Sequence, residues 1–177
     1  MFTLKYIKNI FEIPLNQEDD QLVIDSIAYD TRKIVNGERV IFLCLKGSNR
    51  DGHDYLEDAY NKGVRVAMVS DNDLPDLPGM HFLRVPDVLK SLHQWARQHR
   101  SSREKTTVLG ITGSNAKTII KEWIFKICNP EISVIRSPKS YNSQIGVELS
   151  LLQIKDDHTL GIIEAGISTI DEMAKIE

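Results

Sequence analysis

The sequence predicts an α/β fold, in which a small mixed domain is followed by the first part of a parallel-sheet core. From Thr106 onward, apolar strand-like runs alternate with helical patterns, which is typical of parallel strands joined by helical crossovers. Before Thr106, short β-rich runs surround one short helical pattern. We therefore expect a first domain over residues 1–84, a connecting helix within 85–105, and a partial second domain over 106–177.

The first domain is expected to contain four strands and one helix. The β-rich runs fall at residues 22–29, 39–47, 64–70 and 81–85, and the run over 39–47 is apolar enough to be buried on both faces. Residues 51–63 have helical spacing, and Gly63 is a suitable residue just past a helix end.

The connecting helix is predicted over residues 86–102. One face carries five apolar residues and a histidine: Val88, Leu89, Leu92, Trp95, Ala96 and His99. The basic end of this helix is interpreted as a solvated helix terminus rather than a nucleic-acid contact. We expect both tryptophans, Trp95 and Trp123, to lie in the core.

The second domain is expected to alternate strictly between strands and helices. Strands are predicted at 106–112, 133–137 and 158–166, and helices at 117–128 and about 143–154. This order predicts a parallel sheet with helices packed on it.

Composition and charge exclude several classes of protein. The net charge of the 177 residues is −3, so no overall positive field attracts nucleic acid or a membrane surface. No run approaches the ~18 uncharged apolar residues needed to span a bilayer. The two cysteines, Cys44 and Cys128, lie inside apolar runs and are expected to be buried free thiols. We expect a cytoplasmic protein that binds neither nucleic acid nor a membrane; its oligomeric state is left open.

A short loop, TGSNAKT, links the strand before it to the helix after it. Backbone N–H groups and a helix dipole converge on an anion in such a loop, so we expect it to bind phosphate groups. Lys117 would contact the β- and γ-phosphates, and Thr118 would supply a hydroxyl to Mg²⁺. The predicted nucleotide-binding residues of the loop are Thr112, Gly113, Ser114, Asn115, Ala116, Lys117 and Thr118.

Two further residues are placed near this loop by the expected topology. Glu164 ends a predicted strand, and ligands of open α/β sheets lie beyond the carboxyl ends of the strands. We expect Glu164 to hold Mg²⁺ together with Thr118. Asn142 stands where a strand gives way to a helix, so it can cap the helix and also contact the nucleotide.

Three ordered motifs resemble the Mur ligases, which build the peptide stem of bacterial peptidoglycan. They are DTRKIVNGERVIFLCLKGSNRDGHDYLEDAYNKGV near the amino terminus, then GITGSNAKTIIKEW and SYNSQIGVELSLL, followed by IIEAGIS. The Lys121-Glu122 pair and NSQIGV look most like the branch that adds D-alanyl-D-alanine to UDP-MurNAc-tripeptide. In some bacteria that branch is fused to an alanine racemase, and GSN-KTIIKEW is similar to that group.

The resemblance implies an ATP-dependent amide ligase that activates a carboxylate as an acyl phosphate. By that resemblance Lys117 is the catalytic residue at the γ-phosphate, Thr118 and Glu164 hold Mg²⁺, and Asn142 belongs to the nucleotide–metal site. The residues expected to grip the UDP end of the substrate are Thr31, Arg32, Lys46, Gly47, Asp51, Gly52 and His53.

Two departures qualify this interpretation. Ala116 replaces the glycine that normally precedes the lysine, and a positive φ there would cost about 1–2 kcal/mol. The helical spacing that begins at Ile170 is short, so we expect a piece of a longer ligase that does not ligate alone. Two alternatives stay open: a folylpolyglutamate synthase-like ligase, which is not expected to carry the amino-terminal motif, and a non-catalytic nucleotide-binding module.

Overall fold

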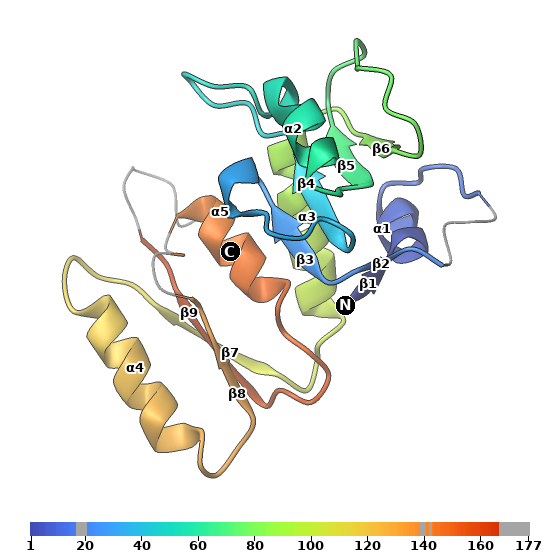
Figure 1. The fold of residues 1–177 in the computed structure, drawn as a ribbon. Helices are drawn as coiled ribbons and strands as arrows, with labels where there is room; N and C mark the ends of the chain where they lie inside the picture. The colour runs from blue at the N-terminus through green and yellow to red at the C-terminus, as the bar shows by residue number, and fades with distance from the viewer. Residues whose placement is uncertain (17–20, 139–140, 142, 167–177) are drawn as a thin grey trace. The chain divides into compact units, whose positions relative to one another are not determined.

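The computed structural model describes residues 1–16, 21–138, 141 and 143–166, and it confirms the α/β fold (Figure 1). The chain divides into two compact units between Ser91 and Leu92. Helix α3, Val88–Ser101, begins in the first unit and continues into the second. Each unit contains its own parallel sheet.

The first unit is built on a four-stranded parallel sheet in the order β3-β4-β5-β6. A two-stranded antiparallel pair, β1-β2, lies beside helix α1 in the chain. The bounds are β1 Phe2–Thr3, α1 Leu4–Ile10, β2 Val23–Ile24, β3 Ser26–Ala28, η1 Thr31–Lys33, β4 Val40–Leu43, η2 Gly52–Tyr55, α2 Leu56–Asn61, β5 Val66–Val69 and β6 His81–Arg84.

The central strands of this sheet follow the predicted pattern. Every residue of β4 and β5 is buried, as expected for parallel strands covered on both faces. The run predicted as one strand over 22–29 is interrupted at Asp25, because the N–H groups of Asp25 and Ser26 both donate to the Arg39 carbonyl. The helix predicted over 51–63 begins as a 3₁₀ turn, and Gly63 follows its end with φ +92°, as predicted.

The second unit contains a three-stranded parallel sheet in the order β7-β9-β8. On one face, α4 packs Ile124 and Phe125 against Ile162 of the central strand; on the other, α5 packs Val147 against Ile163. Because β7, β8 and β9 run parallel, their carboxyl ends meet at one edge of the sheet. The bounds are β7 Thr107–Ile111, α4 Lys117–Cys128, β8 Val134–Arg136, α5 Gln144–Leu151 and β9 Leu160–Glu164.

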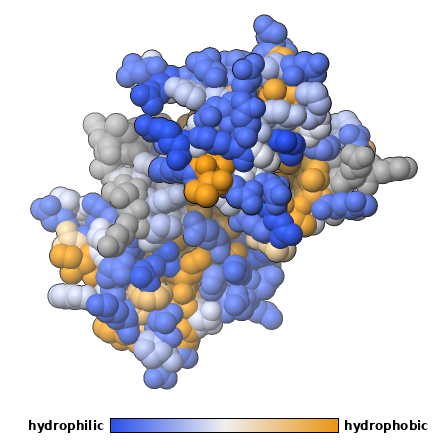
Figure 2. All heavy atoms as spheres, viewed as in Figure 1, coloured by the Kyte–Doolittle hydropathy of each residue, from blue (hydrophilic) through white to orange (hydrophobic). Residues whose placement is uncertain are grey.

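The two tryptophans have opposite environments. Trp95 is fully buried, as predicted, but the prediction for Trp123 is wrong, because 64% of its surface is exposed. Helix α4 is apolar on more than one side, and spacing alone does not reveal which side faces the sheet. The exposed apolar side chains of α4 are Ile119, Ile120, Trp123 and Ile127. Figure 2 shows hydrophobic residues gathered on the face of the second unit where α4 lies in Figure 1.

The structure also shows the state of the two cysteines and whether any helix could span a membrane. Both cysteines are free; Cys44 is buried, as predicted, whereas Cys128 is only half-buried on α4. Among the residues that the structure describes, no helix combines the length and apolar character required to cross a bilayer.

Candidate nucleotide and metal site

The loop between β7 and α4 has the backbone of a tight phosphate-binding turn. Gly113 has φ +141°, and Ala116 has φ +63° and ψ +4°, which is the left-handed helical conformation. Alanine in this conformation brings its Cβ close to the following carbonyl and costs about 1–2 kcal/mol. Ala116 therefore has the positive φ that makes alanine a costly replacement for glycine at this position.

The N-cap residue of α4 does not satisfy the N–H donors at the amino terminus of the helix. Ala116 occupies the N-cap position and makes no side-chain capping hydrogen bond, so the first N–H groups of the helix receive no cap from the N-cap residue. The ammonium of Lys117 folds back over the loop and donates to the Gly113 carbonyl at 2.6 Å. Residues 112–116 are exposed, which leaves this donor-rich end open to an anion.

Glu164 lies at the end of β9 with its carboxylate against the start of α4. The Thr118 hydroxyl lies 3.0 Å from each carboxylate oxygen, so the structure brings these two predicted metal ligands together. Glu164 is only 5% exposed, and its backbone N–H donates to Ser137 Oγ at 2.8 Å. A hydroxyl and a carboxylate are the hard oxygen donors that Mg²⁺ prefers, so the residues present fit this ion.

Lys121 is a member of this site that sequence reasoning missed. Its side chain is fully buried, and its ammonium lies 3.1 Å from Glu164 Oε2. From the sequence, Lys121 was noted only in the Lys121-Glu122 pair that resembles the Mur ligases, and it was given no role in the site. The available signal was its spacing, because a residue three positions after Thr118 lies on the same helical face.

Asn142, the remaining predicted nucleotide ligand, lies outside the residues that the structure describes. The helix expected after it is present as α5, and Ser143 rather than Asn142 is the N-cap of α5, with its hydroxyl accepting from the Gly146 N–H.

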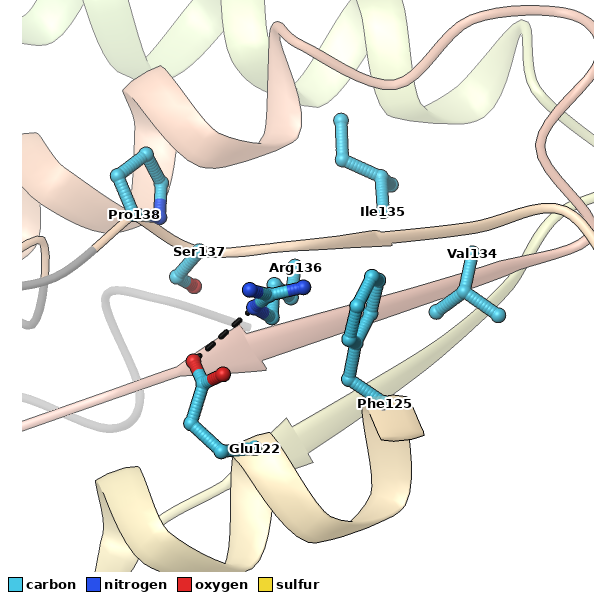
Figure 3. Close-up of a pocket in the computed structure, with 7 residues that line it drawn as sticks. All are labelled: Glu122, Phe125, Val134, Ile135, Arg136, Ser137 and Pro138. Carbon is cyan, nitrogen blue, oxygen red and sulfur yellow. Dashed lines mark hydrogen bonds and ion pairs between the residues drawn. The ribbon is translucent and has the colours of Figure 1, made fainter. Parts of the chain in front are cut away.

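A pocket of about 370 Å³ lies beside the end of β8 (Figure 3). The Arg136 guanidinium stacks over the Phe125 ring at 3.5 Å and donates to Glu122 at 3.0 Å. These charged groups satisfy each other. The contacts of Arg136 therefore hold β8 against α4 next to Ser137, and we assign the pocket no ligand.

In the first unit, the predicted substrate residues gather at the carboxyl ends of parallel strands. Thr31 and Arg32 follow β3, and the segment from Lys46 to His53 follows β4. Thr31 is buried in η1, whereas Arg32 is exposed and makes a two-point contact with Asp30 at 2.8 and 2.9 Å. The Arg32 guanidinium lowers the pKa of Asp30 to about 2.

Lys46, Asp51, His53 and Asp71 form one polar cluster in this loop region. Lys46 pairs with both aspartates, and its hydrogen bond to Asp71 raises the pKa of Lys46. Partial burial raises the pKa of Asp51, but hydrogen bonds from His53 outweigh it, so the net shift is downward. The aspartate and histidine ligand atoms are close enough together to suit a cation, but Lys46 already supplies positive charge there.

Both ring nitrogens of His53 are occupied within the protein. Nδ1 contacts Asp51 Oδ1, and Nε2 accepts the backbone N–H groups of Ser70 and Asp71 at 3.0 and 3.3 Å. This arrangement requires the tautomer with its proton on Nδ1. His53 therefore ties the loop after β4 to the loop after β5.

Comparison with known families assigns both units. Residues 23–100 match the family described as "Mur ligase family, catalytic domain", and residues 111–177 match "Mur ligase middle domain". The chain belongs to the Mur ligase family. The two matches follow each other in the order that the sequence motifs indicated.

Curated relatives narrow the resemblance to one branch of the Mur ligases. The chain is 33% identical over 172 residues to the UDP-N-acetylmuramoyl-tripeptide--D-alanyl-D-alanine ligase of Bacillus subtilis, covering 94% of this chain and 37% of that enzyme. It is 29% identical to the ligase of the same name from Escherichia coli, covering 97% of this chain and 36% of that enzyme. The chain thus spans little more than a third of these relatives.

Solved structures of Mur ligases share the fold. The crystal structure I of MurF from Acinetobacter baumannii matches with a TM-score of 0.82 and 23% identity, covering 99% of this chain and 38% of that one. MurF ligase from Thermotoga maritima in complex with ADP matches with a TM-score of 0.72 and 23% identity, covering 88% of this chain and 35% of that one.

Proposed function

We propose that this chain supplies the substrate-binding and nucleotide-binding parts of an ATP-dependent amide ligase. The whole protein adds D-alanyl-D-alanine to UDP-MurNAc-tripeptide in peptidoglycan synthesis, in the cytoplasm. The observation that carries the proposal is the Thr118 hydroxyl 3.0 Å from both oxygens of Glu164, beside a helix terminus without a side-chain cap. The names of the B. subtilis and E. coli relatives give the substrates.

The proposed chemistry makes a leaving group from a carboxylate. A carboxylate oxygen of the UDP-linked peptide attacks the γ-phosphorus of ATP, and ADP leaves as the acyl phosphate forms. The amine of D-alanyl-D-alanine then attacks the acyl carbon and loses a proton. The C–O bond breaks, and inorganic phosphate leaves with its electron pair. The protein contributes positioning and neutralisation of charge.

In this proposal each predicted site residue of the second unit has a role in binding ATP or Mg²⁺. The α4 N–H groups and the exposed residues 112–116 cradle the phosphates, and Lys117 turns from the Gly113 carbonyl to the γ-phosphoryl oxygens. Thr118 and Glu164 hold Mg²⁺, with Asn142 as a further contact. When bound, the ion would supply positive charge that offsets the charge of the phosphates.

In the first unit, the carboxyl-terminal loops bind the UDP end of the substrate. Arg32 and Lys46 are exposed cations of these loops, and Thr31, Gly47 and Asp51–His53 shape the surrounding backbone. We assign His53 the task of fixing this loop, since both of its nitrogens have partners.

The test is ligand-dependent thermal unfolding of the 177-residue chain. Ligands that bind only the folded state raise its stability by about 2.7 kcal/mol at a hundred times their dissociation constant. We expect ATP·Mg²⁺ and UDP-MurNAc-tripeptide each to raise the unfolding temperature. Lys117→Met should remove the response to ATP·Mg²⁺ and keep the response to the UDP compound.

The matched control is Lys126→Met on the same helix, where the lysine is exposed and should leave both responses intact. Stabilisation by folate in place of UDP-MurNAc-tripeptide would favour a folylpolyglutamate synthase-like ligase. A chain that responds to none of these ligands would overturn the proposal in favour of a non-catalytic module.

A further inference from the structure

Helix α4 carries two lysines whose environments differ completely. Lys117, at its first position, is half-buried at the mouth of the loop. Lys121, one turn later, is 0% exposed and reaches Glu164 Oε2 at 3.1 Å. The second lysine therefore lies behind the metal-binding carboxylate, on the side away from solvent.

Burial of this ammonium is costly and calls for an explanation. Taking a charged pair out of water is unfavourable for each ion, and an apolar pair of the same size is often as stable. Packing α4 on the sheet does not require a cation, because Ile124 and Phe125 already supply apolar contacts. The charge at Lys121 is better explained by the carboxylate it contacts.

The Glu164 carboxylate is fixed by contacts of two kinds. The Thr118 hydroxyl lies at equal distances from both oxygens, so it does not favour one of them. Lys121 contacts Oε2, and no contact of Lys121 with Oε1 is present among the described residues. Lys121 is thus the group that distinguishes the two oxygens and sets the rotation of the carboxylate.

We infer that Lys121 is a positioning residue of the metal site. It holds Glu164 by Oε2, so that Oε1 and the Thr118 hydroxyl are the pair of oxygens offered to Mg²⁺. The inference rests on the proposed function, because it assigns a role in the same nucleotide–metal site. Partners that orient a metal ligand typically contribute about 10- to 100-fold to metal affinity.

The test compares nucleotide binding with and without the metal. ADP is titrated into the 177-residue chain by calorimetry, once in EDTA and once over a series of Mg²⁺ concentrations. In Lys121→Met, the metal-free affinity for ADP should stay within about twofold, since neither the helix terminus nor Lys117 changes. The Mg²⁺ concentration that gives half of the metal-dependent gain should rise about tenfold.

A purely structural role for Lys121 gives a different pattern. Loss of packing would weaken ADP binding with and without Mg²⁺ alike, or would change only the unfolding temperature. Lys126→Met is the matched control and should leave both titrations unchanged. If Lys121→Met does not fold, Lys121→Gln, which keeps an N–H donor without the charge, takes the same test with the same expected rise.

Failure of this inference is distinguishable from failure of the proposed function. If the unaltered chain gains ADP affinity from Mg²⁺ and both Lys121 variants gain it at the same Mg²⁺ concentration, the positioning role is overturned and the ligase proposal stands. If the unaltered chain binds no ADP under either condition, both are overturned.

Discussion

The loop after β4 and the loop after β7 both leave the carboxyl end of a parallel strand, but they hold their polar groups in opposite ways. In the first, Lys46, Asp51 and His53 are held by contacts among themselves and with Asp71 of the loop after β5. In the second, Lys117 contacts only a loop carbonyl among the described residues, and α4 has no side-chain cap. The first loop is therefore rigid by internal pairing, whereas the second keeps its donors available to a ligand.

The two loops also differ in whether their backbone leaves room for a side chain at a tight position. At Gly52, the Cβ of any larger residue would lie 2.6 Å from Leu45 N and 2.7 Å from Cys44 Cα. At Ala116, a Cβ is present although φ is +63°. The first loop therefore excludes a side chain by close packing, and the second accepts one at a cost in strain.

The largest expected effect that tests this comparison comes from Gly52→Ala. The added methyl group meets main-chain atoms, which can move away only if the β4 end shifts with them. We expect the free energy of unfolding to fall by about 3 kcal/mol, measured by urea denaturation. Gly47→Ala is the control, because its Cβ would meet only the Arg50 carbonyl at 3.4 Å and should cost less than about 0.5 kcal/mol.

A smaller effect is expected from His53→Ala. The substitution removes the acceptor for two backbone N–H groups and the donor to Asp51, at a side chain that is only 7% exposed. Stability should fall by about 2 kcal/mol while the ADP affinity of the second unit stays unchanged. His158→Ala, which loses one exposed hydrogen bond from the Lys155 N–H, should cost much less. Equal losses in the two variants would contradict the internally paired loop.

The sequence predicted part of the fold and part of the candidate site of this protein. The strand–helix alternation from Thr106 onward predicted the parallel sheet of the second unit, because parallel strands and their helices leave strong local patterns. In the first unit the sequence predicted strands, but not that four of them form one parallel sheet. The start of α4 at Lys117 followed from the helical pattern that begins after the loop. The meeting of Thr118 with Glu164 followed from the rule that ligands of such sheets lie at the carboxyl ends of the strands.

Features that depend on which helix face meets the sheet could not be predicted. Trp123 is exposed and Lys121 is buried, which reverses what hydrophobicity alone suggests. The cause is the orientation of α4, which turns the Lys121 side toward Glu164. Likewise, the pairing of His53 with the Ser70 N–H joins residues 17 positions apart, and spacing within one motif does not reveal it.

The smallest expected change in stability comes from Ala116→Gly, and it tests the second loop directly. Glycine removes a left-handed strain of about 1–2 kcal/mol but loses about 0.5–1 kcal/mol in chain entropy, so stability should rise by at most about 1.5 kcal/mol. ATP binding should tighten, because a glycine loop can bring its N–H groups closer to the phosphates. The comparison variant is Ala96→Gly within α3, where glycine should destabilise by about 1 kcal/mol without changing ATP affinity. Calorimetric titration of ATP·Mg²⁺ into both variants separates the effects, and an unchanged affinity in Ala116→Gly would refute the view that Ala116 weakens the site.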